Sequence, residues 1–183
     1  MKEEKKNEQP KVFLGVEGYF LKTGDIVEGV NIELNGITYI EDSLVPVNKV
    51  NEPALVHCNI MFPLSVLSIE DAPVLYSAIL RHIASRILWN VKNLEKYLRN
   101  FRRISFSSFK HLLMMELAYV LNSAYSSHIS SCDKVYVCGQ NNSVLLVDNS
   151  CSRLDTPCFR TKTEAEIAIR LLSILELYFV GDE

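Results

Sequence analysis

The sequence predicts an α+β domain: an N-terminal antiparallel β-meander of three to four strands, two central helices, a short β pair and a C-terminal helix. Short alternating runs separated by turn residues over 11–62 predict the strands. Apolar residues at helical spacing over 71–103, 109–121 and 164–179 predict the helices. Because strands and helices fall in separate parts of the chain, the class is α+β, with helices packed against an antiparallel sheet.

The length of 183 residues is typical of one domain, which we expect over 11–183, with a β-rich part (11–67) and a helix-rich part (71–183). Residues 1–10, MKEEKKNEQP, are charged and lack an apolar stretch, which predicts a disordered tail and not a signal peptide. No apolar run reaches the roughly 18 residues of a membrane span, so we expect a cytoplasmic protein without a membrane partner. Glutamine occurs only at Gln9 and Gln140, a composition that favours a thermophilic source.

The first strands are predicted at 11–22, 25–34 and 37–42. Asn35-Gly36 separates the second from the third and is the strongest short hairpin signal, since a type I′ turn needs positive φ at both positions. Residues 43–53, with two prolines, are predicted to be a connection, although the LVPV segment could pair at a sheet edge. A further strand is predicted at 54–62.

The segment 71–103 predicts a single long helix, capped by Ser68 or Asp71 and with Pro73 in its first turn. Its apolar residues recur at alternating steps of four and three and form one seam. The seam consists of Leu80, Ala84, Ile87, Val91, Leu94, Leu98 and Phe101. Burial of the six larger side chains would contribute roughly 10–15 kcal/mol before the entropy cost, so we expect this helix to organise the core.

The remaining elements are a second helix, two short strands and a closing helix. Phe109 to Leu121 follows the helical period, and 134–138 and 144–147 read as a strand pair around Gly139. The closing helix is predicted over 164–179, with a capping box formed by Thr163 and Glu166. Gly181 is expected to end it.

Charge is segregated along the chain. Net charge is −5 over 1–70, +6 over 71–111 and −4 over 112–183. Five cations of the long helix fall within about 60° of one another, opposite the seam, over about 33 Å. They are Arg81, Lys92, Lys96, Arg99 and Arg103, and Trp89 borders them. This stripe predicts a non-catalytic subunit that binds nucleic acid, with phosphates on the cations and a base on Trp89, or an adaptor for an acidic protein partner.

Two alternatives remain from the same helix: a solvated polar face without a partner, and an assembly protein that forms a homo-oligomer through its long helix. The sequence leans away from an enzyme. It contains no G-x-S-x-G, H-E-x-x-H or G-x-x-x-x-G-K-[ST] motif. The four histidines, at 57, 82, 111 and 128, have no spacing that indicates shared ligation.

Four cysteines occur in the last third, with spacing C-x5-C-x12-C-x6-C, and Cys58 stands alone. They are Cys132, Cys138, Cys151 and Cys158. Four thiolates could hold zinc or an iron–sulfur cluster, and two pairs could form disulfides. Because no C-x2-C knuckle is present, we expect free thiols and no cofactor.

The segments FLGVEGYFLKTG and ELAYVLNSAYSSHISSCDKVYVCGQ resemble parts of ribonuclease-H-like and actin-like ATPase folds. The resemblance covers about a quarter of the chain, and this sequence has Glu17 where those families usually have aspartate. It implies, as an alternative function, a small metal-dependent nuclease or nucleotide-binding enzyme. Glu17 would then act with carboxylates such as Glu116, Asp148 and Asp155 to hold Mg²⁺. That alternative requires Glu17, Asp148 and Asp155 to converge in space.

Overall fold

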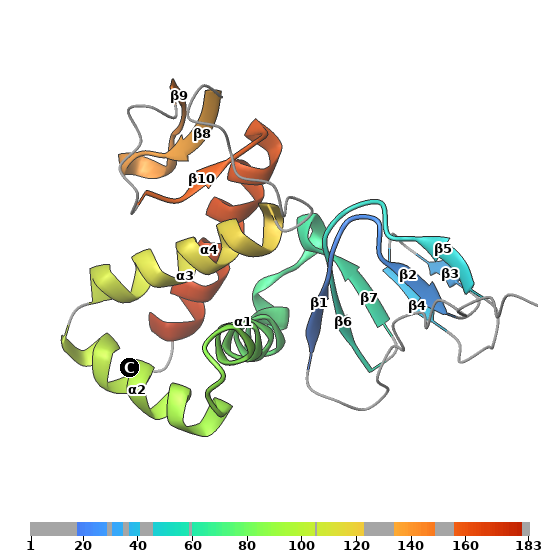
Figure 1. Ribbon diagram of the computed structural model, residues 1–183, viewed down its shortest axis with the longest axis horizontal. Helices are drawn as coiled ribbons and strands as arrows, with labels where there is room; N and C mark the ends of the chain where they lie inside the picture. The colour runs from blue at the N-terminus through green and yellow to red at the C-terminus, as the bar shows by residue number, and fades with distance from the viewer. Residues whose placement is uncertain are drawn as a thin grey trace, which may run out of the picture.

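The fold is α+β, as predicted, in a computed structural model that describes residues 18–28, 31–34, 37–40, 46–58, 60–104, 106–122, 134–148 and 156–180 (Figure 1). The described strands are β1 Tyr19–Leu21, β2 Ile26–Glu28, β3 Asn31–Leu34, β4 Ile37–Ile40, β5 Pro46–Lys49, β6 Ala54–His57, β7 Ile60–Pro63, β8 Lys134–Cys138, β9 Val144–Asp148 and β10 Cys158–Phe159. The described α-helices are α1 Ala72–Arg86, α2 Val91–Ile104, α3 Phe106–Leu121 and α4 Lys162–Val180. Short 3₁₀ turns are η1 Leu64–Val66, η2 Ile69–Asp71 and η4 Gln140–Asn142.

The N-terminal strands form a five-stranded antiparallel sheet in the order β1-β6-β7-β4-β3, beside a two-stranded β2-β5 pair. Strands β3 and β4 pair with Leu34 opposite Ile37, so the predicted hairpin at residues 35–36 is confirmed in its register. Two predictions were wrong. Residues 54–62 form two strands, because the chain turns at Cys58 (φ 48°) and His57 pairs with Ile60. Residues 25–34, predicted as one strand, contain β2 and β3, which belong to different sheets. Within 43–53, Pro46–Lys49 forms strand β5 and pairs with β2, so the pairing considered for the LVPV segment is found in part.

Helix α1 lies close against β1 and β6, and Figure 1 shows it between the sheet and the other helices. Gly18, just before β1, allows this approach. A Cβ atom there would lie 2.7 Å from Cγ1 of Val74 on α1 and 3.1 Å from Cδ1 of Leu55 on β6. Glycine is therefore required at this position by packing, not by its backbone angles.

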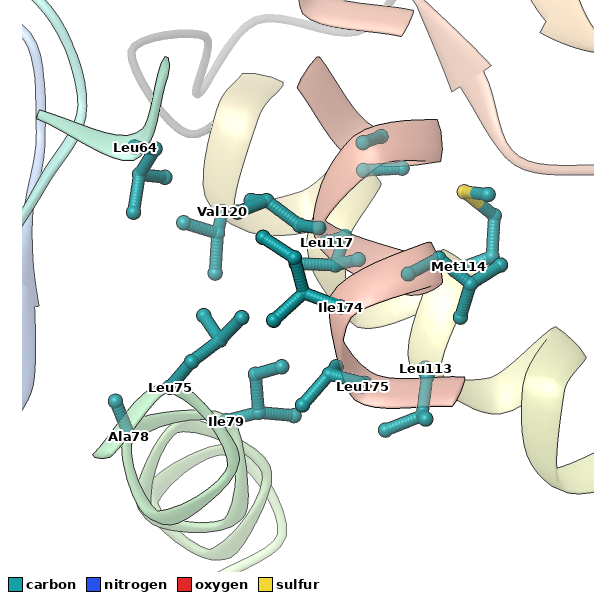
Figure 2. Close-up of a cluster of buried hydrophobic side chains, with 14 of the residues drawn as sticks. Leu64, Leu75, Ala78, Ile79, Leu113, Met114, Leu117, Val120, Ile174 and Leu175 are labelled. Carbon is teal, nitrogen blue, oxygen red and sulfur yellow. The ribbon is translucent and has the colours of Figure 1, made fainter. Parts of the chain in front are cut away.

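The main core lies where α1, α3 and α4 meet, and Figure 2 shows their side chains interleaving. Each of these helices contributes residues that are almost fully buried, including Leu75, Ile79, Leu117 and Leu175. Leu64 of η1 joins them, so the same core reaches the end of the β-rich part. At about 1.5–3 kcal/mol for each large side chain, this cluster is the main apolar contribution to stability.

The predicted single helix over 71–103 is wrong, because the chain leaves the helix after Arg86 and starts α2 at Val91. Leu88 adopts φ 51°, and the Trp89 N–H donates to the Ala84 carbonyl at 3.0 Å. This is the Schellman arrangement that ends helices, here with leucine in place of the usual glycine. Asn90 then caps α2, since its Oδ1 accepts the N–H of Asn93 at 2.8 Å.

The predicted seam is consequently divided between two helices. Leu80 and Ala84 are buried on α1, and Leu94 and Leu98 are buried on α2. Ile87, predicted to be buried, is 52% exposed because it lies at the junction. The seam therefore does not form one continuous apolar helix face, and its buried residues belong to two helices of one chain.

The ends of the helices are set by local capping. Before α1, Ser68 and Asp71 form a capping box on the η2 turn. Asp71 is the N-cap residue of α1 without a side-chain cap bond, and Pro73 lies in the first turn as predicted. The predicted box at Thr163 and Glu166 is wrong. α4 begins two residues earlier, and the Glu164 N–H donates to Thr161 Oγ1 at 3.1 Å while the Thr161 N–H donates to the Glu164 carboxylate at 3.0 Å.

The C-terminal strands form a three-stranded antiparallel sheet in the order β10-β8-β9, which packs against α4. It extends the predicted β pair by one strand. In the part of the chain that the structure describes, no helix combines the length and the apolar character needed to cross a membrane.

Candidate interaction groove

A cavity of about 1150 Å³ lies between the C-terminal end of α1, helix α2 and helix α3. We call it the α2 groove. Its lining is mainly apolar, with three polar side chains on α3. It consists of Ile83, Ile87, Trp89, Leu94, Tyr97, Leu98, Phe101, Ser108, His111, Leu112, Met115 and Glu116. The helix break creates it, because α2 turns back beside α3 instead of continuing α1.

Aromatic rings form one side of the groove. Trp89 packs beside Tyr97, with ring centroids 5.8 Å apart, and Tyr97 stacks on Phe101 at 5.9 Å and 16°. Trp89 and Tyr97 remain 40% and 50% exposed, and Leu88 beside them is 95% exposed. A contiguous exposed apolar patch of this kind is typical of a binding surface in a monomeric protein, and tryptophan and tyrosine are enriched at binding hot spots.

The outer face of α2 is cationic. By helical position, Lys92, Lys96, Arg99 and Arg103 lie within about 60° of one another and opposite buried Leu94. Lys92 and Lys96 are exposed, and neither forms an ion pair with any residue that the structure describes. Arg99 pairs with Glu95 one turn earlier.

The structure brings together four of the six predicted site residues and separates the other two. The four cations of α2 span about 17 Å, about half the expected stripe. Arg81 lies on α1, before the break. Trp89 lies in the junction between α1 and α2, where it packs on Tyr97 and lines the α2 groove.

A rigid ion pair stands at the end of the groove. Nη1 of Arg86 donates to both carboxylate oxygens of Glu116, at 2.8 and 2.7 Å, and the Glu116 side chain is nearly buried. The Arg86 guanidinium lies 3.9 Å from the centre of the Tyr119 ring. A charge-assisted pair and a cation–π contact together fix Arg86 against α3.

Next to this pair, His82 connects the sheet with the helices. Its ring contacts Phe20 of β1 edge-on at 6.3 Å and Tyr119 of α3 at 5.2 Å. Burial, together with the positive charges of Arg86 and Lys22, lowers the pKa of His82 to about 4. The imidazole is therefore neutral near pH 7 and acts as a packing element.

The other predicted chemical groups give no assembled site among the described residues. Glu17, Asp155, Cys132 and Cys151 lie outside the described residues. Asp148 is exposed on β9, and Glu116 is bound by Arg86. Over the ranges that the structure describes, no three His, Cys, Asp or Glu side chains gather in a way that could hold a metal ion.

Among the described residues, Cys58, Cys138 and Cys158 form no disulfide with one another. Cys138 lines a smaller cavity of about 300 Å³ between α3, α4 and the three-stranded C-terminal sheet. Burial raises the pKa of its thiol to about 11, so it stays protonated and is a poor nucleophile near pH 7.

Comparison with protein-family models, with curated proteins and with solved structures found no match for the chain.

The α2 groove is the feature that sequence reasoning missed. Its available signals were the Tyr97–Phe101 pair, four residues apart on one helix face, and Asn90, a residue type favoured at helix N-termini.

Proposed function

We propose that this protein is a non-catalytic adaptor that binds an acidic protein partner on the surface formed by α1, α2 and α3. The observation that carries the proposal is the α2 groove, an exposed aromatic and aliphatic surface on the same helix as the exposed cations Lys92 and Lys96, which form no ion pair with any residue that the structure describes. Apolar surface supplies affinity, while cations on the outer face of the same helix supply selection for negative charge and a faster encounter.

The charge distribution supports the sign of the partner. Residues 72–121, which contain all three helices, hold eight lysines and arginines against Glu95 and Glu116, a net charge of +6, whereas the whole chain carries −3. A second copy would bring the same positive charge to the interface. Like charges across an interface are unfavourable, so an acidic partner fits this surface better than another copy of the chain.

Nucleic acid is a second candidate, favoured by the four cations that remain on one face of α2. Two observations count against it. The stripe is about half the expected length, and Trp89 packs on Tyr97 in the groove, which is also lined by aliphatic side chains. Aliphatic walls suit apolar side chains of a protein better than bases.

Binding to model polyanions tests the proposal. The protein is titrated with a random copolymer of glutamate and tyrosine, and with single-stranded and duplex oligonucleotides of equal charge. We expect the copolymer to bind most tightly and to retain binding at high salt through its apolar contacts. Tighter binding of an oligonucleotide, lost steeply as salt rises, would favour the second candidate. Absence of binding to all three at low salt would refute both.

Charge reversal localises the surface. Lys92→Glu with Lys96→Glu should weaken copolymer binding by about tenfold or more. The matched control is Lys134→Glu with Lys162→Glu, which changes the net charge equally at exposed positions on β8 and α4. We expect the control to bind within about twofold of wild type, since its charges lie away from the groove. Equal loss in both variants would show that only net charge matters.

A further inference from the structure

We infer that the segment bound in the α2 groove is an amphipathic helix with one apolar and one acidic face. This deepens the proposed function and rests on it: the adaptor proposal concerns the acidic nature of the partner, and the present inference concerns the conformation in which it binds. Three features support it: the helical backbone of the groove walls, the order of the side chains around α2, and the volume of the groove.

The walls of the groove favour a helical occupant over an added strand. Its lining residues belong to α1, α2, α3 and the short junction between α1 and α2, and no described strand edge borders it. Helical backbone groups are already hydrogen-bonded within their own helices, so they cannot pair with a bound strand. A segment that enters an apolar groove must therefore satisfy its own backbone groups, because unpaired polar groups in such a place are costly. A helix meets this requirement.

The rim of α2 changes character in one direction around the helix. Tyr97 lies at the edge of the groove, Asn93 and Asn100 follow at about 40–60° further around, and Lys96 and Lys92 come next. Lys96 and Lys92 lie about 100° and 140° from Tyr97 around α2, so a bound helix would place its apolar side chains against Trp89 and Tyr97 and its acidic side chains toward Lys96, the nearer lysine. Apolar anchors at i, i+3, i+4 and i+7 are the known pattern of this mode of recognition.

The size of the groove agrees with a peptide segment. Its volume of about 1150 Å³ exceeds the roughly 300–1000 Å³ of small-molecule pockets, and its aromatic side is open to solvent. Helix α2 has 14 residues, about 21 Å long, so it can support about three to four turns of a partner helix.

A designed peptide tests the inference. It has about 15 residues, with leucines at i, i+3, i+4 and i+7 and glutamates on one flank, and it is compared with a scrambled peptide of identical composition. Trp89 is the only tryptophan in the chain and lines the groove, so its emission reports occupancy directly. We expect the amphipathic peptide to shift Trp89 emission to shorter wavelength and to bind about tenfold or more tightly than the scrambled one.

The outcomes separate the two proposals. Equal binding of both peptides would overturn the helical inference and leave charge-directed adaptor binding intact. Failure of the amphipathic peptide to bind, while the glutamate–tyrosine copolymer binds, would also overturn the inference alone. Failure of the copolymer in wild type would refute the proposed function itself.

Two variants address the location. Tyr97→Ser should weaken the amphipathic peptide about tenfold, whereas the matched control Leu177→Ser, an exposed apolar residue on α4 outside the groove, should leave its binding unchanged. Both side chains are at least half exposed, so neither change is expected to unfold the protein. Peptide binding that survives Tyr97→Ser would place the site elsewhere and overturn the inference.

Discussion

Replacement of Leu88 by glycine should stabilise the protein, and the sign of the change tests the helix break directly. Leu88 has φ 51°, a left-handed conformation that costs an L-residue about 1–2 kcal/mol. Glycine removes that cost but loses about 0.5–1 kcal/mol more backbone entropy on folding. Because Leu88 is 95% exposed, almost no buried apolar area is lost. The net expectation is a gain of about 0.5–1 kcal/mol in the free energy of unfolding.

A continuous helix from 71 to 103 makes the opposite prediction. Leu88 would then be an interior helical residue, and glycine there would cost about 1 kcal/mol. Equilibrium unfolding in urea, analysed by linear extrapolation, resolves a difference of this size. In thermal unfolding, we expect the melting temperature to rise by about 1–4 °C.

Two control variants sharpen this experiment. Leu88→Ala keeps a side chain at positive φ and should change stability little, which separates backbone relief from loss of the leucine. Leu177→Gly removes an exposed leucine from the interior of α4 and should lose about 1 kcal/mol. The reasoning would be refuted if Leu88→Gly destabilised the protein as Leu177→Gly does.

Three further predictions concern packing and charge. Gly18→Ala should lose about 1–3 kcal/mol, because its Cβ would meet Val74, and Val74→Ala in the same chain should restore part of the loss in urea unfolding. Glu116→Gln should lose about 1–2 kcal/mol through the weaker bond to Arg86, and unchanged stability would show that the pair contributes nothing net. The pKa of His82 is about 4 in the folded state and 6.5 in the unfolded state. The unfolded state therefore binds more protons between pH 4 and pH 6.5. The stability that neutral His82 contributes is complete above pH 6.5 and is lost as the pH falls toward 4. His82→Phe should reduce the fall in urea midpoint between pH 7 and pH 5, and an unchanged pH dependence would contradict this assignment.

The sequence determined the elements whose signals are local. Short alternating runs specified strands, and Asn35-Gly36 specified the hairpin register that pairs Leu34 with Ile37. The period of 3.6 residues identified the apolar faces of α3 and α4 and the buried residues Leu94 and Leu98 of α2. These signals depend only on neighbours along the chain, so no tertiary information was needed.

The helix break could not be read from the same pattern. The apolar steps of four and three continue through Leu80, Ala84, Ile87, Val91 and Leu94 without a change of phase. The chain ends α1 with leucine in the left-handed conformation, where glycine would have been the recognisable stop signal. Packing of α2 beside α3 compensates for the conformational cost at Leu88. Such long-range compensation cannot be predicted from one sequence.

The candidate site depends on the break between α1 and α2. Lys92, Lys96, Arg99 and Arg103 stayed on one face because they share one helix, which local spacing determines. Trp89 moved from the expected cationic stripe into an aromatic groove because the chain turns between Arg86 and Val91. Local periodicity thus fixed which residues share a helix face, while the three-dimensional packing of α1, α2 and α3 decided which faces meet and which apolar side chains remain exposed.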